Sequence, residues 1–210
     1  MSKKGVLTVV SGFSGAGKGT LMKSLLAKYE YGLSISATTR KPREGEVHGR
    51  EYFFLSKEEF ESMIAKEQFI EWAQYVGNYY GTPRAYVEEQ LQAGKNVILE
   101  IEIQGAINVR KMFPEALLIF VTPPSAKELK ARLVGRGTET MEVIEQRMQR
   151  ALEECPYMSQ YDTIAINDNL DICVEEIHTL IERKHNEEDI ALTAKDMDLI
   201  ERMQTELKAL

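Results

Sequence analysis

The sequence is poor in cysteine and has no long apolar run. Of its 210 residues, only Cys155 and Cys173 are cysteines, and their spacing matches no metal-binding motif. So few cysteines fit a reducing compartment better than a disulfide scaffold, and we expect a cytoplasmic protein. The longest apolar run spans residues 116–121, whereas a membrane-spanning helix needs about 20 residues. The apolar stretch after Lys3 and Lys4 is too short for a signal peptide, and no cleavage pattern follows it. We therefore expect neither a membrane span nor a secretory leader.

Aspartate is absent from the first 161 residues, because the first one along the chain is Asp162. Any acidic catalytic group before that position must be a glutamate. The net charge of −7 argues against a general nucleic-acid-binding protein. Residues 1–50 nevertheless carry nine basic and three acidic side chains, a local charge of +6. The sequence therefore places a positive segment inside an acidic protein.

Apolar β-type runs alternate with helical patterns, which favours an α/β fold with a largely parallel sheet. The length and the 43% hydrophobic fraction fit one globular domain with inserts. We predict strands over 5–11, 96–103, 116–122 and 163–166. We predict helices over 20–29, 83–94, 125–134, 141–158 and 171–186, and a short helix after 56. The helices at 56 and 125 each begin with a capping-box pattern, Ser-x-x-Glu.

Two segments depart from this alternation. Residues 34–82 are rich in β-formers, glycine and tyrosine and contain no long helical pattern, so we interpret them as an insert that faces the site. The last residues, 186–210, form an acidic amphipathic pattern with Ile200, Met203 and Leu207 on one face. We interpret this pattern as a helix that packs on its own chain or on another subunit.

A glycine-rich loop lies between the first predicted strand and the helix after it. It is Gly12-Phe13-Ser14-Gly15-Ala16-Gly17-Lys18-Gly19-Thr20. The loop fits the pattern G-x-x-x-x-G-K, in which backbone N–H groups cradle phosphates and the lysine reaches the β- and γ-phosphates. We therefore expect residues 12–20 to bind ATP and Lys18 to be catalytic. Gly19 stands where a Ser or Thr usually helps to hold Mg²⁺, which leaves direct metal ligation by the loop open.

Further motifs follow the loop in order along the chain. They are Ser34-Ile35-Ser36-Ala37-Thr38-Thr39-Arg40-Lys41-Pro42-Arg43-Glu44-Gly45-Glu46, and the segments 69–73, 77–82, 99–105, 123–125 and 136–139. Together with the loop, these motifs resemble the guanylate kinases from about residue 5 to residue 185. The resemblance implies a P-loop nucleoside monophosphate kinase fold, with helices flanking a parallel sheet. It also implies the reaction of Mg·ATP with GMP, which gives ADP and GDP.

The resemblance divides a single domain, 1–210, into functional parts. It implies a core formed by 5–33, 83–124 and 159–185, a GMP-binding insert at 34–82 and an arginine-bearing lid at 125–158. Residues 186–210 extend beyond the usual end of the family. Two departures are mild, because Phe13 replaces the proline of many members and Glu102 replaces an aspartate.

By resemblance, the phosphate of GMP is bound by Arg40 and Arg43, with hydroxyl hydrogen bonds from Tyr52 and Tyr80. The residue type suits this role, since a guanidinium fork matches a phosphate with two parallel hydrogen bonds. Without the resemblance, two arginines in a surface loop could equally be solvated side chains.

The base of GMP requires a different partner. Guanine presents N1–H and N2–H₂ side by side, so one carboxylate accepts both, whereas adenine presents an acceptor at N1 that repels a carboxylate. We predict that Glu71 reads this edge, with Ser36 and Thr82 at the guanine O6 edge and Glu102 as a second acceptor. On pattern alone, Glu71 could instead be an outward-facing residue of an alternating strand.

Four arginines gather around the segment 136–139. Phosphoryl transfer needs alignment and cations around the transferring group more than covalent chemistry. The resemblance implies that Arg136 and Arg147 close over the phosphates as catalytic residues. Arg150 is a weaker candidate, and so is Arg132, which could simply form an i,i+4 helix pair with Glu128.

Two further residues complete the predicted ATP side. Glu100 ends an apolar strand and could order water bound to Mg²⁺, or it could be a structural carboxylate. Asn167 resembles a residue of the adenine-contacting segment. We expect Mg²⁺ as cofactor, held mainly by ATP phosphates and water, and ATP and GMP as the small-molecule partners. We expect no nucleic acid or membrane partner, and we consider a homo-oligomer formed through the C-terminal helix.

Two alternatives stay open. Another nucleoside monophosphate kinase would need the same loop, although the predicted carboxylate and hydroxyl set favours guanine. A non-catalytic guanylate-kinase-like binding module is the other alternative. Its ATP loop is typically degraded, whereas this chain keeps Gly12, Gly15, Gly17 and Lys18.

Overall fold

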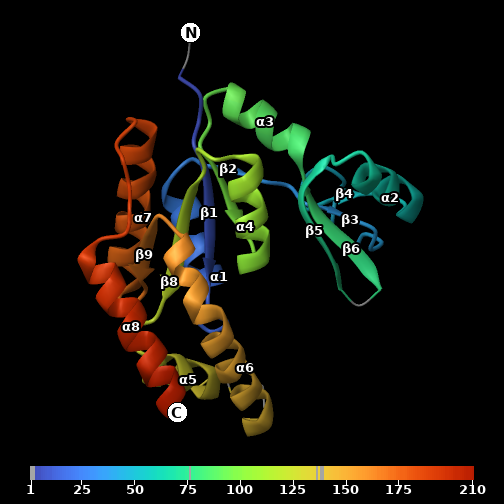
Figure 1. Ribbon diagram of the computed structural model, residues 1–210. Coiled ribbons are helices and arrows are strands. Elements are labelled where there is room, and N and C mark those ends of the chain that lie inside the picture. Colours follow the sequence, from blue (N-terminus) through green and yellow to red (C-terminus); the bar gives the residue numbers. More distant parts are fainter. Residues whose placement is uncertain (1–2, 76, 136, 138–139) are drawn as a thin grey trace.

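The computed structural model describes residues 3–75, 77–135, 137 and 140–210. At its centre lies a five-stranded sheet with the order β2-β7-β1-β8-β9 (Figure 1). The strands are β1 (Leu7–Gly12), β2 (Gly32–Leu33), β7 (Val97–Glu100), β8 (Leu117–Thr122) and β9 (Thr163–Ile166). All four pairings between neighbours are parallel, which confirms the predicted α/β class with a parallel sheet.

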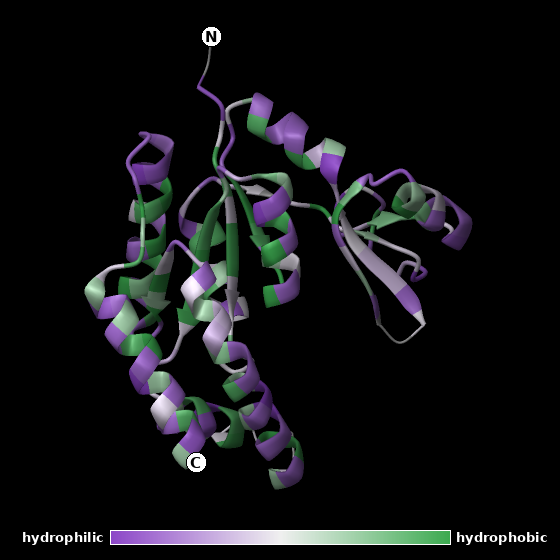
Figure 2. Cartoon of the chain, in the orientation of Figure 1, coloured by the Kyte–Doolittle hydropathy of each residue, from purple (hydrophilic) through white to green (hydrophobic). Residues whose placement is uncertain are grey.

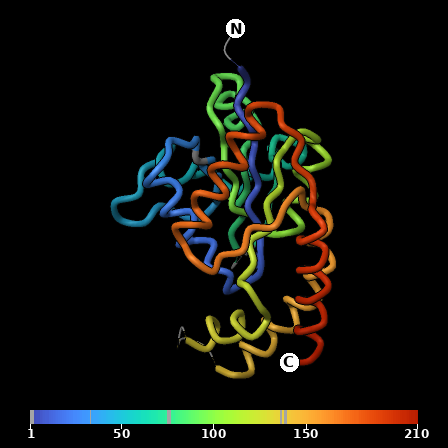
Figure 3. The backbone as a smooth tube through the Cα atoms, turned by 90° about the vertical axis from the view of Figure 1, so that its left-hand side faces the viewer, coloured from blue at the N-terminus to red at the C-terminus, as the bar shows by residue number. Residues whose placement is uncertain are grey.

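Helices cover both faces of this sheet. Helices α1 (Lys18–Lys28) and α7 (Leu170–His185) pack on one face, and α3 (Arg84–Gln92) and α4 (Ile103–Met112) lie on the other (Figures 1 and 3). Colouring by hydropathy shows the central strands as apolar and the outer helices as largely polar (Figure 2). All six residues of β8 are buried. This layering holds the loop after β1 at the carboxyl ends of the strands, where parallel α/β sheets bind their ligands.

A second sheet stands apart from the first, on the right in Figure 1. It has the order β4-β3-β6-β5, with β3 (Ala37–Thr38), β4 (Phe53–Phe54), β5 (Phe69–Tyr75) and β6 (Asn78–Pro83). Helix α2 (Lys57–Ala65) covers it through Phe60, whose ring stacks on Phe69 at 4.2 Å and on Tyr79 at 5.2 Å between ring centroids. The predicted capping box of α2 is confirmed, with Ser56 and Glu59 bonded reciprocally.

Helices α5 (Ala126–Gly135), α6 (Met141–Glu154) and α8 (Ala194–Ala209), together with the 3₁₀ segment η1 (Cys155–Gln160), gather below the core in Figure 1. Helix α8 packs on α5, α6 and η1. It buries Ile200, Met203 and Leu207, as its amphipathic pattern predicts. The apolar face of α8 is therefore covered within the chain.

Three predicted elements need correction. The strand predicted over 96–103 ends at Glu100, and Ile103 begins α4, a helix that was not predicted. The helix predicted over 141–158 changes to a 3₁₀ segment at Cys155, because Pro156 lacks the N–H of a regular α-helix. Only half of the second capping box forms. Ser125 Oγ accepts from Glu128 N at 3.1 Å, but the Glu128 carboxylate pairs with Arg132.

Among the described residues, no helix combines the length and apolar character needed to cross a bilayer.

Candidate active site

The glycine-rich loop runs from the end of β1 to the start of α1, as its sequence predicts. Gly12, Gly15 and Gly17 have φ angles of 154°, 97° and 88°, which L-residues with a Cβ rarely adopt. Two of these positions also leave no room for a side chain. A Cβ on Gly12 would lie 2.0 Å from the carbonyl oxygen of Val121, and one on Gly17 would lie 2.7 Å from Asn167 Nδ2. The glycines are therefore required by the path of the loop.

Lys18 and Asn167 hold the two ends of the loop. Lys18 Nζ donates to the carbonyl oxygens of Gly12 at 2.6 Å and Phe13 at 3.1 Å. Asn167, which is buried, donates from Nδ2 to the carbonyl of Ala16 at 2.9 Å. The loop ends at the N-terminus of α1, where free N–H groups and the helix dipole favour an anion. The Phe13 side chain packs edge-on against Phe120, so it serves the core.

The loop borders a cavity of about 490 Å³ at the carboxyl ends of the strands. Its lining is rich in charged groups, which come from the loop, from the segment after β7 and from α6. Arg147 of α6 reaches across it and donates from Nη1 to the hydroxyl of Ser14. A predicted lid arginine and the predicted phosphate loop are therefore in contact.

Arg150 of α6 lines the same cavity but is paired with acids. Its Nε lies 2.8 Å from Glu154 Oε1, and its Nη2 lies 3.1 Å from Glu102 Oε2. Arg132 Nε forms an ion pair with Glu128 Oε1 at 2.8 Å, which is the i,i+4 helix pair that the sequence left open as an alternative. Arg136, the other predicted lid arginine, lies outside the described residues.

Glu100 is one of three carboxylates that line the loop cavity. It borders the cavity at the end of β7, where desolvation by surrounding atoms raises its pKa and the charge of Lys18 opposes that rise. The described part of the chain contains no group of three His, Cys, Asp or Glu side chains able to hold a metal ion. This donor set fits Mg²⁺ bound by substrate phosphates, water and at most one or two carboxylates, as is usual for this ion.

The insert holds the predicted base reader together with a hydroxyl partner. Thr82 Oγ1, on the buried part of β6, donates to Glu71 Oε1 at 2.7 Å. Burial raises the pKa of Glu71, and the hydrogen bonds from Thr82 oppose the rise. The carboxylate therefore keeps one oxygen held by the insert and has acceptor capacity left for a ligand.

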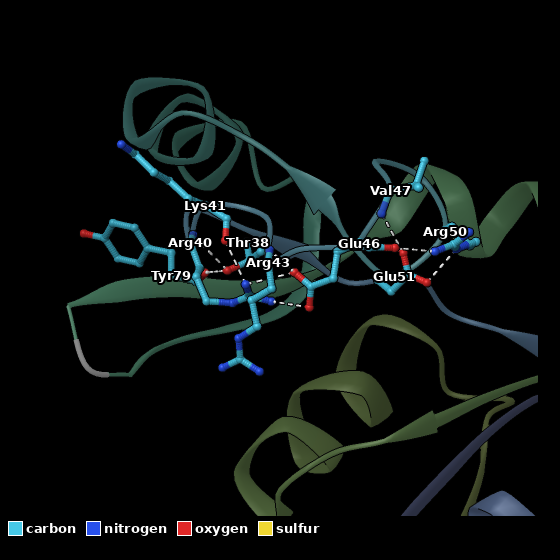
Figure 4. A network of polar contacts seen from close by, with 10 residues as sticks. Thr38, Arg40, Lys41, Arg43, Glu46, Val47, Arg50, Glu51 and Tyr79 are labelled. Carbon is cyan, nitrogen blue, oxygen red and sulfur yellow. Dashed lines mark hydrogen bonds and ion pairs between the residues drawn. The ribbon is translucent and has the colours of Figure 1, made fainter.

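The insert also gathers the predicted phosphate-binding side chains. The guanidinium of Arg40 lies over the ring of Tyr52 at 5.5 Å, and the rings of Tyr52 and Tyr80 are 6.1 Å apart. Hydrogen bonding with Glu46 is the main cause of a raised Arg40 pKa, and a contact with the Tyr80 hydroxyl adds to it. Arg43 directs its guanidinium away from Glu46 (Figure 4).

Two of the predicted guanine ligands make other contacts in this structure. Ser36 accepts a backbone bond from Phe53 N at 2.9 Å through its carbonyl, and its hydroxyl stays only a predicted ligand. Glu102 is the N-cap residue of α4, 80% of its side chain is exposed, and it pairs with Arg150 in the loop cavity. Sequence reasoning quoted Glu46 only as part of a motif and gave it no role, although its pairing with Arg40 is central to this cluster.

Similarity to known proteins covers most of the chain. The sequence profile of the family described as guanylate kinase matches residues 4–184. A guanylate kinase from Bacillus cereus (strain ZK / E33L) is 53% identical over 201 residues, covering 93% of this chain and 97% of its relative. One from Bacillus subtilis (strain 168) is 52% identical over 189 residues, covering 88% and 92%.

A solved structure shares the fold as well. The crystal structure of guanylate kinase from Anaplasma phagocytophilum superposes with a TM-score of 0.65 at 29% identity, covering 88% of each chain. The glycine loop, the arginine that contacts it and the carboxylate–hydroxyl pair of the insert all lie within the matched residues 4–184. On this evidence, the chain belongs to the guanylate kinase family.

Proposed function

We propose that this chain transfers the γ-phosphoryl group of ATP to GMP, giving ADP and GDP. In this reaction a phosphate oxygen of GMP forms a bond to the γ-phosphorus. The bond from that phosphorus to the β,γ-bridging oxygen breaks, and ADP leaves with the bond electrons. The chain is a nucleoside monophosphate kinase by family, and the residues named below are our assignment of its parts.

The observation that carries the choice of GMP is the pair formed by Glu71 and Thr82. The carboxylate can accept both N1–H and N2–H of guanine, while the Thr82 hydroxyl fixes its orientation from the opposite side. Adenine would place its N1 lone pair against the same carboxylate. A site with buried hydrogen-bonding groups rejects an unmatched substrate by about 10⁴-fold or more.

On the donor side, the loop amides and the start of α1 bind the ATP phosphates. Lys18 now donates to two loop carbonyls. We expect its ammonium to turn to the β- and γ-phosphates when ATP binds, because a phosphate is the stronger acceptor. Asn167 fixes the loop at Ala16 and lies where the family places the adenine-contacting segment.

On the acceptor side, Arg40, Arg43, Tyr52 and Tyr80 hold the phosphate of GMP. The guanidinium of Arg40 lies 5.5 Å from the ring centroid of Tyr52, and this contact restricts its motion, so less conformational entropy is lost when it binds. Ser36 and Glu102 remain proposed ligands of guanine. For Glu102 this role requires its carboxylate to leave Arg150.

The lid arginines stabilise charge on the transferring group. Arg147 already contacts Ser14 of the loop, so its guanidinium is placed beside the phosphates that the loop would bind. By family resemblance Arg136 joins it, and closure of the lid excludes water that would otherwise hydrolyse ATP. No residue is assigned as a general base.

A magnesium ion bound together with ATP would offset the negative charge of the phosphates. Of the chain's own groups, Glu100 is placed to accept hydrogen bonds from water on that ion, because its carboxylate borders the loop cavity. Gly19 supplies no hydroxyl ligand.

The test is ADP formation from Mg·ATP with GMP, AMP, CMP, UMP and dTMP offered separately. Turnover with GMP alone is expected. Turnover with a different nucleotide would leave the assignment of the phosphate loop intact and refute the assignment of Glu71. Folded protein with no turnover would favour a binding module over an enzyme.

We also propose the cytoplasm as the place of action. Both cysteines are free, buried thiols, which suits a reducing compartment.

A further inference from the structure

Glu46 occupies an unexpected position beside the predicted phosphate site. Its two carboxylate oxygens accept from Nη1 and Nη2 of Arg40, each at 2.9 Å, and both side chains are only 17% exposed. A carboxylate on a phosphate-binding arginine repels a phosphate by charge alone. The pair therefore either blocks the site or orients the arginine for it.

The hydrogen bonds of Arg40 distinguish these possibilities. A guanidinium has five N–H donors in a fixed plane. Two go to Glu46, and a third, on Nη1, goes to the carbonyl of Lys41 at 2.7 Å. The other two, on Nε and Nη2, lie side by side on one edge of the plane. That edge is the fork that binds two oxygens of a phosphate. Glu46 does not cover it, and the Tyr80 hydroxyl, itself a predicted phosphate ligand, also contacts the guanidinium.

Glu46 also fixes the backbone of the second arginine. Its Oε2 accepts from Arg43 N at 2.7 Å, and its own N–H donates to the carbonyl of Arg43 at 3.1 Å. The resulting turn has Gly45 in its third position with φ 85°, as type II turns require. One carboxylate thus links the guanidinium of Arg40 to the main chain at Arg43, while the Arg43 guanidinium points away from it (Figure 4).

The carboxylate is suited to stay ionised in this position. Hydrogen bonds from Arg40 and from the Arg43 backbone hold the pKa of Glu46 below its ordinary value. Thr38 supports the same segment, since its hydroxyl accepts from Arg40 N at 3.2 Å and donates to the Tyr79 carbonyl at 2.9 Å (Figure 4).

From this geometry we infer that Glu46 is a positioning residue for the phosphate of GMP. It turns the Nε/Nη2 edge of Arg40 toward the ligand and sets the spacing between Arg40 and Arg43. This role rests on the proposed function, because it needs a phosphate of GMP at these arginines.

The test compares Glu46→Gln with Glu44→Gln. Glu44 is exposed and lies in the same turn, so both variants remove one negative charge beside the phosphate site. If Glu46 acted only through its negative charge, both variants would bind GMP as well as the wild type or better. If Glu46 positions the two arginines, only Glu46→Gln should bind GMP more weakly than the wild type. The Gln amide would turn N–H groups toward Arg40, and we expect the KM for GMP to rise about 10-fold with the KM for ATP unchanged.

Two further measurements separate positioning from damage to the insert. Guanosine lacks the phosphate, so its inhibition constant against GMP should be the same for Glu46→Gln and wild type. In an Arg40→Ala background, Glu46→Gln should have little further effect on the KM for GMP, because the Gln oxygen can still accept from Arg43 N and the contact with Arg40 is already gone. A loss of guanosine binding, or a fully additive loss in the double variant, would overturn the inference.

The outcomes also distinguish this inference from the proposed function. If the wild type does not phosphorylate GMP, the proposed function fails. If it does, and Glu46→Gln matches Glu44→Gln or binds GMP more tightly than wild type, the function stands. Glu46 is then a competitor of the phosphate or a bystander.

Discussion

Replacing Glu71 by Gln tests the recognition of the base without changing the size of the side chain. In the wild type, the carboxylate accepts from Thr82 Oγ1 at 2.7 Å and would accept from N1–H and N2–H of guanine. A Gln side chain offers one oxygen and one NH₂ group. The NH₂ group of Gln must then face either the Thr82 hydroxyl or the N–H groups of guanine, so one hydrogen bond is lost. The remaining bond is to a neutral amide oxygen instead of a charged carboxylate.

The magnitude follows from these two changes. A hydrogen bond to a charged group contributes about 1.5–3 kcal/mol, and a neutral one contributes about 0.5–1.5 kcal/mol. Losing one charged bond and weakening the other therefore costs about 3–4 kcal/mol, which is about 10²- to 10³-fold in kcat/KM for GMP. The KM for ATP should stay the same. The Gln amide matches the N1 and N6 edge of adenine, so the ratio of AMP to GMP turnover should rise.

The folding stability of Glu71→Gln should stay the same or rise while its kcat/KM for GMP falls. This difference separates a role in recognition from a role in folding. Burial raises the pKa of Glu71 above its ordinary value of 4.5, so the folded state binds a proton there more tightly than the unfolded state. The stability from this group is present below pH 4.5 and is lost as the pH rises through the raised value. At pH 7 the ionised carboxylate is a cost, and Glu71→Gln should melt at or above the temperature of wild type.

Steady-state kinetics with GMP and AMP, together with melting curves at pH 7 and pH 4.5, check this prediction. Glu61→Gln is the matched control, because Glu61 is an exposed carboxylate on α2 of the same insert. The KM of wild type for GMP should also rise as the pH falls through the raised pKa of Glu71. Equal kcat/KM for Glu71→Gln and wild type would refute base recognition by this carboxylate. A lower melting temperature at pH 7 would show a structural role instead.

Three further substitutions examine the loop, the lid and the C-terminal helix. Arg147→Lys keeps the charge but loses the planar fork, and kcat should fall about 10²-fold. The control is Arg183→Lys at an exposed position on α7. An unchanged kcat for Arg147→Lys would remove Arg147 from the mechanism. Gly17→Ala would put a Cβ 2.7 Å from Asn167 Nδ2 at φ 88°. Calorimetry should show weakened ATP binding, and wild-type affinity would contradict the strict need for glycine there. Met203→Ala removes a side chain that is fully buried. It should lower the free energy of unfolding by about 2–5 kcal/mol, and a urea midpoint equal to that of wild type would mean that α8 does not pack as described.

The phosphate loop was predictable because its requirements are local. Its glycines are dictated by φ angles within the loop itself, and the flanking strand and helix have clear hydrophobic patterns. The parallel sheet was predictable for a similar reason, since strands buried on both faces are continuous apolar runs. Features that depend on one short stretch of chain can be inferred from that stretch.

Helix α4 was missed because its first residues mimic a strand. Leu99, Ile101 and Ile103 alternate with two glutamates, which is the pattern of a half-buried strand. In the structure, parallel pairing with β1 stops at Glu100, and Ile103, Ala106 and Val109 are buried at helical spacing. Strand β1 continues to Gly12 and pairs there with β8, so the end of β7 is the point where its pairing with β1 stops, and a single segment does not reveal that point.

The pairing of Glu46 with Arg40 could not be predicted from the motif that contains both residues. The residue types were visible, and six positions separate them. Their contact depends on the turn at Gly45 and on the rings of Tyr52 and Phe54, which lie 5.5 and 5.8 Å from the guanidinium. Phe54 belongs to β4, and Tyr52 is the residue before that strand. The pair is therefore a product of the folded insert.

The orientation of Glu71 shows most clearly why a functional side chain can contradict its pattern. The hydrophobic effect alone would place Trp72 inside and Glu71 outside, yet Trp72 is 47% exposed and Glu71 meets the buried Thr82. The cause is an irregularity between Phe69 and Glu71, where the register with β6 shifts. Such bulges re-aim side chains and are frequent beside active sites. A strand that exposes its only tryptophan and turns a carboxylate inward sacrifices stability, and that sacrifice is expected where a ligand supplies the missing partner.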